Sequence, residues 1–135
     1  MKHPHLTECG LPGITHIPYG VHMCNFYRTR EELAAALVPF FAAGLRTNER
    51  RALAEGYAGL RITGNVTFLR SEDWALFMEY EELVNRAFQG RRIITLCTYQ
   101  MESCGASEMY DVLRRHNGAL DGPDEGWQIL TARPA

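Results

Sequence analysis

The stretch Arg92–His116, RIITLCTYQMESCGASEMYDVLRRH, decides the fold of this chain. Its first part, from Ile93 to Cys97, is a β-branched apolar run that is short enough to be a buried strand. Polar and small residues follow, and then apolar residues recur at helical spacing as far as His116. We therefore predict a strand, a turn and a helix, with Cys97 and Cys104 on either side of the turn. In open α/β sheets, ligands bind at such turns, where the carboxyl ends of the strands lie.

Strands and helices are predicted to alternate along the rest of the chain. Thr29 and Ser71 are good N-cap residues for two helices, which are expected to end near Gly44 and Gly90. This alternation predicts a three-layer α/β fold, with a mostly parallel sheet of about four strands and helices on both faces. The last strand suits an antiparallel position at an edge. The predicted strands are 21–27, 60–65, 92–98 and 127–131, and the other predicted helices are 48–56 and 106–117.

Composition indicates one soluble globular domain. The chain has 135 residues, of which 46% are hydrophobic and 22% are charged. Residues 1–20 are rich in proline and glycine and are predicted to form an N-terminal arm, while 21–135 form a single domain. The N-terminus lacks the apolar run of a signal peptide, and no stretch reaches the length of a membrane span. We expect a cytoplasmic protein with reduced thiols and no membrane partner.

Several catalytic and binding classes are disfavoured by the residues. The net charge of -2 and the scattered arginines give no electrostatic reason to bind nucleic acid directly. The sequence has no phosphate-binding loop, no G-x-S-x-G, no H-E-x-x-H and no C-x-x-C. No nucleophile and base occur at a recognisable spacing, so an enzyme is the weakest hypothesis. No cofactor is identified by the sequence.

Four residues lie at or just beyond predicted strand ends and are candidates for a binding crevice. They combine aromatic surface with a few polar groups, a composition that suits a small organic molecule. In a parallel sheet they are expected to share one crevice, although turn chemistry and packing would also explain them. These residues are Tyr27, Asn65, Thr98 and Tyr99.

Histidine and cysteine side chains offer a second hypothesis, a metal- or redox-sensing site made of His22, Cys24, Cys97 and Cys104. The alternative is that the cysteines are small buried hydrophobes and that His22 is a hydrogen-bonded core residue. A thiol at a helix N-terminus has a lowered pKa, so Cys104 is predicted to be the reactive cysteine.

Two further features of the sequence have ordinary structural interpretations. His116 is interpreted as a helix C-terminal histidine that satisfies carbonyl groups. Glu81 and Glu82 are interpreted as solvated residues rather than as a catalytic pair.

Several blocks of the sequence resemble the MEDS domain, the methanogen/methylotroph DcmR sensory domain. They are YGVHMCNFYRTREELAAALVPFFAAGL, GYAGLRITGN, DW, YEELVN and ITLCTYQMESCGASEMYDVLRRH, and they cover most of residues 16–131 in family order. The resemblance implies a fold similar to the RecA/KaiC core without its nucleotide-binding loop. It also implies sensing of small molecules such as hydrocarbon derivatives in transcription regulators and histidine-kinase-like proteins. The residues that match recurrent family positions are His22, Cys24, Tyr27, Gly64, Asn65, Cys97, Tyr99, Cys104, Ser107 and His116.

The chain departs from the family pattern in its middle. Family members usually have several dozen more residues, including a strand, between the segments that Glu49, Arg50 and Arg51 join directly here. Loss of a strand opens a sheet edge, which invites pairing with another copy, so a homodimer is predicted.

We therefore expect a non-enzymatic sensory domain that binds a small organic molecule at the carboxyl ends of its strands. A separate output protein, a regulator or a kinase, would receive the signal. The expected ligand-binding residues are His22, Cys24, Tyr27, Asn65, Cys97, Tyr99, Cys104 and His116. A metal or redox sensor that uses His22, Cys24, Cys97 and Cys104, and a scaffold that binds no small molecule, remain the alternatives.

Overall fold

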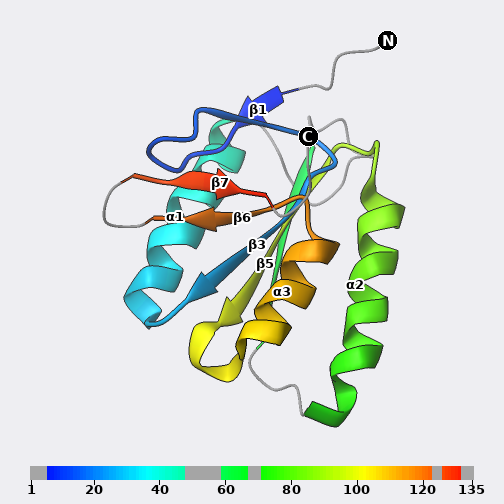
Figure 1. Cartoon of the computed structure of the whole chain (residues 1–135). Helices are drawn as coiled ribbons and strands as arrows, with labels where there is room; N and C mark the ends of the chain where they lie inside the picture. Colours follow the sequence, from blue (N-terminus) through cyan, green and yellow to red (C-terminus); the bar gives the residue numbers. More distant parts are fainter. Residues whose placement is uncertain (1–5, 48–58, 67–70, 123–125, 132–135) are drawn as a thin grey trace.

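The computed structural model describes residues 6–47, 59–66, 71–122 and 126–131. These residues form a five-stranded sheet, a small two-stranded sheet and three α-helices (Figure 1). The predicted helix at 48–56 lies outside the described residues. The strands are β1 (Leu6–Glu8), β2 (His16–Pro18), β3 (His22–Tyr27), β4 (Leu60–Val66), β5 (Ile93–Gln100), β6 (Gly118–Asp121) and β7 (Gln128–Leu130). The helices are α1 (Arg30–Arg46), α2 (Trp74–Phe88) and α3 (Ala106–Arg115), with 3-10 turns η2 (Ser71–Asp73) and η3 (Met101–Ser103).

The large sheet has the strand order β4-β5-β3-β6-β7 and is mostly parallel, as predicted. β5 and β3 pair in parallel near its centre, with Cys24 opposite Cys97. β4 is parallel to β5 and forms one edge among the described residues, and β7 is antiparallel to β6 at the other edge. The antiparallel last strand is therefore confirmed. β6 was not predicted, so the sheet has five strands instead of about four.

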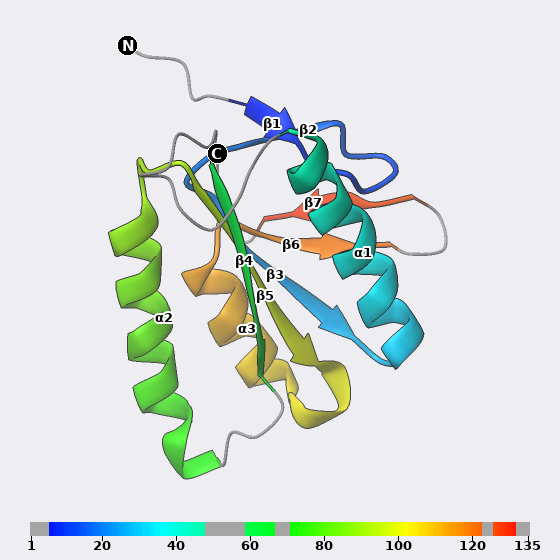
Figure 2. The same ribbon diagram turned by 180° about the vertical axis from the view of Figure 1, so that it is seen from behind.

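Helices lie on both faces of the sheet. Figures 1 and 2 show α1 on one face, the α1 face, and α2 with α3 on the other, the α2/α3 face. Alternate residues of each strand point to opposite faces, so each face has its own core. The core of the α1 face includes Met23, Ala36, Phe40, Ile94, Leu96 and Leu120. The core of the α2/α3 face contains Cys24, Met78, Cys97, Tyr99, Val112 and Ala119.

The first turn of α1 has the side-chain cap that its sequence predicts. The Thr29 hydroxyl accepts a hydrogen bond from the Glu32 backbone N–H at 3.1 Å. The Glu32 carboxylate in turn accepts from the Arg28 backbone N–H at 2.8 Å. The helix was predicted to end near Gly44. Instead Gly44 is buried within α1, which continues to Arg46. The next helix begins later than predicted, because Ser71 starts the turn η2 and α2 begins at Trp74.

The N-terminal segment packs into the core of the α1 face through four buried apolar residues, Cys9, Leu11, Ile14 and Ile17. Its β1 and β2 are only three residues long, as expected from its prolines and glycines. Among the described residues, no helix is long and apolar enough to cross a bilayer.

Arg61 of β4 connects this segment to α1. Its guanidinium group donates hydrogen bonds to the backbone carbonyls of Glu8, Cys9 and Phe40, at 3.0 Å for Cys9 and 2.7 Å for Phe40. It also lies over the Phe40 ring, 4.8 Å from the ring centroid. Arg61 is only 7% exposed, so its charged group is held inside the protein by these contacts.

Replacing Arg61 with methionine should lower the free energy of unfolding by roughly 2 to 4 kcal/mol, because buried carbonyls lose a charged donor. Equilibrium urea unfolding measures this change. The exposed Arg91 provides the matched control, and Arg91→Met should change stability by less than about 0.5 kcal/mol. Equal stability of the two variants would show that the Arg61 contacts do not stabilise the fold.

Candidate functional site

Four buried polar side chains meet between the sheet and its two covering helices on the α2/α3 face. His22 is the first residue of β3, Glu81 lies in the middle of α2, Cys97 lies in β5, and His116 follows α3. Each is at most 5% exposed. One donor atom from each side chain can be chosen so that all four lie within 4.8 Å of one another. We call these residues the four-residue cluster.

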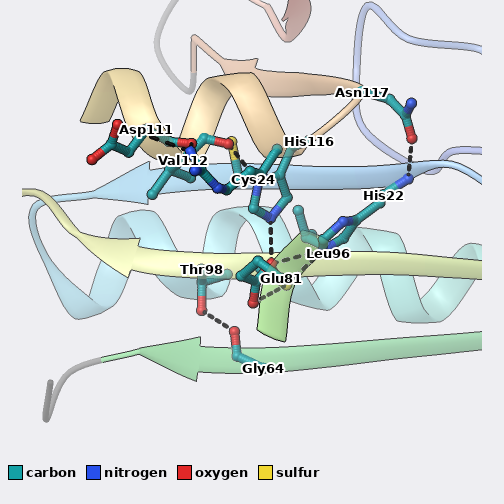
Figure 3. Close-up of polar contacts among 12 residues, drawn as sticks. His22, Cys24, Gly64, Glu81, Leu96, Thr98, Asp111, Val112, His116 and Asn117 are labelled. Atoms are coloured by element: carbon teal, nitrogen blue, oxygen red, sulfur yellow. Dashed lines mark hydrogen bonds and ion pairs between the residues drawn. The ribbon is translucent and has the colours of Figure 1, made fainter. Parts of the chain in front are cut away.

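The Glu81 carboxylate lies at the centre of the cluster. Its Oε2 atom is 3.0 Å from Nε2 of His22 and 2.9 Å from Nε2 of His116. The Cys97 Sγ atom is 3.3 Å from Nε2 of His22 and 3.7 Å from the same carboxylate oxygen. Figure 3 shows Glu81 pointing toward His116 and His22, and the centroids of the two imidazole rings are 3.9 Å apart.

Glu81 is therefore not the solvated residue that the sequence was taken to indicate. Its position in α2 explains why, because Trp74, Glu81 and Phe88 follow one another at intervals of seven residues and share a face of the helix. That face packs on the sheet. The regular placement of a carboxylate on an apolar stripe was the signal that could have identified it.

The electrostatics of the cluster keep Glu81 ionised. Burial raises the pKa of its carboxyl group, but the contacts with His116 and His22 outweigh burial and lower the pKa to about 2. Burial lowers the pKa of His116, and nearby His22 acts in the same direction. Burial raises the pKa of the Cys97 thiol, and the charge of Glu81 raises it further. The cluster is thus built around a permanent buried negative charge.

His116 has both the predicted role and one that was missed. Its Nδ1 atom lies 2.6 Å from the Val112 carbonyl oxygen, one turn back in α3, as expected of a histidine at a helix C-terminus. Its Nε2 atom faces Glu81 instead of solvent.

A pocket of about 290 Å³ lies between α2 and the strands β4 and β5. Two members of the cluster, Glu81 and Cys97, form part of its wall together with Thr95. Tyr80 also lines the pocket and is 57% exposed, so the pocket reaches the protein surface. The remaining side chains around it are mainly apolar: Ile62, Phe77, Val84 and Phe88.

The other two residues of the predicted metal or redox site lie outside the four-residue cluster. Cys24 is buried nearby, and its thiol donates to the Gly118 carbonyl at 3.7 Å. Cys104 lies between η3 and α3 and is only partly buried. The predicted lowering of the Cys104 pKa is wrong: burial raises it, and the Glu108 carboxylate in the first turn of α3 acts in the same direction.

The predicted crevice residues are divided between the two faces of the sheet. Asn65 Oδ1 accepts hydrogen bonds from the Tyr27 hydroxyl at 2.9 Å and from the Thr98 hydroxyl at 3.2 Å. These three side chains therefore do lie together. Tyr99 belongs to the core of the α2/α3 face, because neighbouring residues of a strand point in opposite directions. A ligand-binding role for any of these residues stays a prediction.

The fold and the site define an α/β domain with a buried, charged cluster beside a small pocket. The family model of the MEDS domain, described as "MEthanogen/methylotroph, DcmR Sensory domain", matches residues 50–117, just over half of the chain. The chain belongs to this family of sensory domains, as its resemblance implied. The match includes Glu81, Cys97 and His116, whereas His22 precedes it. No curated protein and no solved structure shows a significant match.

Replacing Glu81 with glutamine should lower the free energy of unfolding by roughly 1 to 3 kcal/mol, because the two histidines lose a charged partner. Urea unfolding in the presence of EDTA measures this without any contribution from metal ions. Glu82, the next residue of α2, provides the control: among the described residues its carboxylate forms a surface pair with Arg86, so Glu82→Gln should be nearly neutral. A Glu81→Gln variant as stable as Glu82→Gln would contradict the central role of this carboxylate.

Cys104 should be the first cysteine to react with iodoacetamide, because the other three are buried. Glu108→Gln should increase its rate by about twofold to fivefold at mildly alkaline pH, since removal of the charge lowers the thiol pKa. Time-resolved mass spectrometry measures the rate, with Glu102→Gln as the control at an exposed position. An unchanged rate in Glu108→Gln would exclude this electrostatic effect.

Proposed function

We propose that this chain is the sensing unit of a signalling system and that it binds a small, mostly apolar molecule in the pocket between α2 and β4. The main observation in support of this proposal is that the pocket combines apolar walls with the buried polar groups of Glu81 and Cys97. Ligand pockets are usually apolar, with a few polar groups that fix orientation. At about 290 Å³ the pocket lies at the small end of their size range, so the ligand has few heavy atoms.

The position of the pocket supplies a route from binding to output. A ligand there contacts α2 on one side and β4 with β5 on the other. α2 also packs against α3, and the Trp74 indole donates to the Asp111 carboxylate at 3.1 Å. Binding would therefore alter how α2 packs on the sheet and on α3. A separate regulator or kinase that contacts these helices would receive the change.

The ligand class follows from the walls of the pocket. Aromatic and aliphatic side chains provide dispersion contacts, and a smaller number of polar groups complete the wall, namely Thr63, Asn65, Glu81, Thr95 and Cys97. A short hydrocarbon chain with one polar or halogen substituent suits this arrangement. This class agrees with the hydrocarbon derivatives that the family resemblance implies.

Filling the pocket should abolish binding. Val84→Phe places a larger apolar side chain in the pocket, whereas Val38→Phe makes the same change at an exposed position on α1, on the opposite side of the sheet. Saturation-transfer NMR with short-chain alcohols, ketones and chlorinated hydrocarbons as probes measures binding. We expect wild type and Val38→Phe to bind at least one class alike, and Val84→Phe to bind it about tenfold more weakly or not at all. No binding by the wild type, or equal binding by Val84→Phe, would exclude this pocket.

A further inference from the structure

The hydrogen bond that His116 makes through Nδ1 leaves its other ring nitrogen, Nε2, facing the carboxylate of Glu81. Nδ1 is 2.6 Å from the Val112 carbonyl oxygen and can approach it so closely only by donating its hydrogen. The neutral ring then has its lone pair on Nε2. That atom is 2.9 Å from Glu81 Oε2, and Figure 3 draws this contact as a dashed line. A lone pair and a carboxylate oxygen repel each other at this distance, so the arrangement calls for a cation, either a proton or a metal ion, at His116 Nε2.

His22 presents a nitrogen to the same point. Its Nε2 atom lies 3.0 Å from Glu81 Oε2 and 3.3 Å from Cys97 Sγ. Its other ring nitrogen, Nδ1, is buried and has no hydrogen-bond partner in the described part of the chain. Nε2 is thus the ring atom through which His22 takes part in the cluster, and it faces one oxygen and one sulfur.

The spacing of the donor atoms matches the coordination shell of a small metal ion. With bonds of about 2.0 Å to nitrogen and oxygen and about 2.3 Å to sulfur, neighbouring donors of a tetrahedral zinc site lie roughly 3.3 to 3.6 Å apart. The close pairs here are 2.9, 3.0, 3.3 and 3.7 Å apart. Small side-chain adjustments would bring them to the coordination values.

The charges also balance. A Cys97 thiolate and the Glu81 carboxylate together have two negative charges, and the two imidazoles are neutral when they bind a metal. A divalent cation makes the buried cluster neutral overall, which removes the cost of an isolated buried charge. Thiolate and imidazole donors favour zinc and related transition ions over magnesium or calcium.

We propose that His22, Glu81, Cys97 and His116 bind one divalent transition-metal ion, with zinc as the best fit to the donor set. Four elements of the α2/α3 face supply one ligand each: β3, α2, β5 and the end of α3. The bond from His116 Nδ1 to the Val112 carbonyl oxygen is the outer contact that orients a metal-binding imidazole. The pocket beside Glu81 and Cys97 gives the ion a path from solvent. This site is independent of whether an organic molecule occupies that pocket.

The test uses the untagged full chain, stripped of metal with EDTA and titrated with Co²⁺ under reducing conditions. We expect one Co²⁺ per chain, with the visible bands of tetrahedral cobalt and a near-ultraviolet thiolate-to-cobalt band. Zn²⁺ should displace the cobalt and raise the melting temperature of the protein, because it binds the folded state. A wild-type chain that binds neither ion stoichiometrically would overturn the proposal.

Variants assign the ligands. Cys97→Ser should remove the thiolate band, and His116→Gln should weaken Co²⁺ binding by about tenfold or more. Cys104→Ser is the matched control for the thiol, and a variant with His3→Gln, His5→Gln and His16→Gln is the control for the imidazoles. Both controls should keep the wild-type stoichiometry and spectrum. Loss of the ion in either control would place the site elsewhere.

A measurement on the wild type remains decisive if Cys97→Ser fails to fold. X-ray absorption of the zinc-loaded wild type should show one sulfur at about 2.3 Å and nitrogen or oxygen neighbours at about 2.0 Å. A shell without sulfur would exclude Cys97 and overturn the proposed site. Val84→Phe should still bind zinc, so failure of the proposed pocket and failure of the metal site give different results.

Discussion

The buried, ionised carboxylate of Glu81 is the constraint on which the α2/α3 face depends. A charge removed from water is tolerated only where neighbouring groups compensate it. Here the neighbours come from β3, β5 and the end of α3, so the position of α2 on the sheet is set by polar contacts as well as by apolar packing. The same carboxylate lines the pocket beside α2. Anything that changes the charge or position of Glu81 therefore acts on the packing of three elements together.

The two faces of the sheet divide structural and chemical roles. Strand alternation sends Met23, Ile94 and Leu96 to the α1 face, where they build a closed apolar core with α1 and the N-terminal segment. The alternate residues of the same strands, such as His22 and Cys97, face α2 and α3. Rigid support on one face and titratable groups with a pocket on the other is an arrangement suited to sensing.

The strongest local patterns in the sequence predicted much of the fold. The β-branched run of β5, the Thr29 cap of α1 and the alternation of His22, Cys24 and Phe26 each describe contacts within a few residues. β6 was missed because its four residues, Gly118–Asp121, have no strand pattern of their own and are held by pairing with β3. Three residues of the four-residue cluster, His22, Cys97 and His116, are among the candidates that the sequence indicated. Glu81 was missed because a single charged residue in a helix is usually solvated, and only its seven-residue spacing from Trp74 and Phe88 marked it as inward.

Arg61 holds the N-terminal segment against α1 by donating hydrogen bonds to main-chain carbonyls, those of Glu8 and Cys9 in the segment and of Phe40 in the helix. A carbonyl group is present whatever side chain a residue has. The three accepting positions are consequently free to vary in sequence without losing this attachment, as long as the backbone keeps its path. The donating position has no such freedom, since no other side chain offers as many donors in one planar group. These hydrogen bonds should therefore depend on the side chain at one position, Arg61, and on the path of the backbone at the other three.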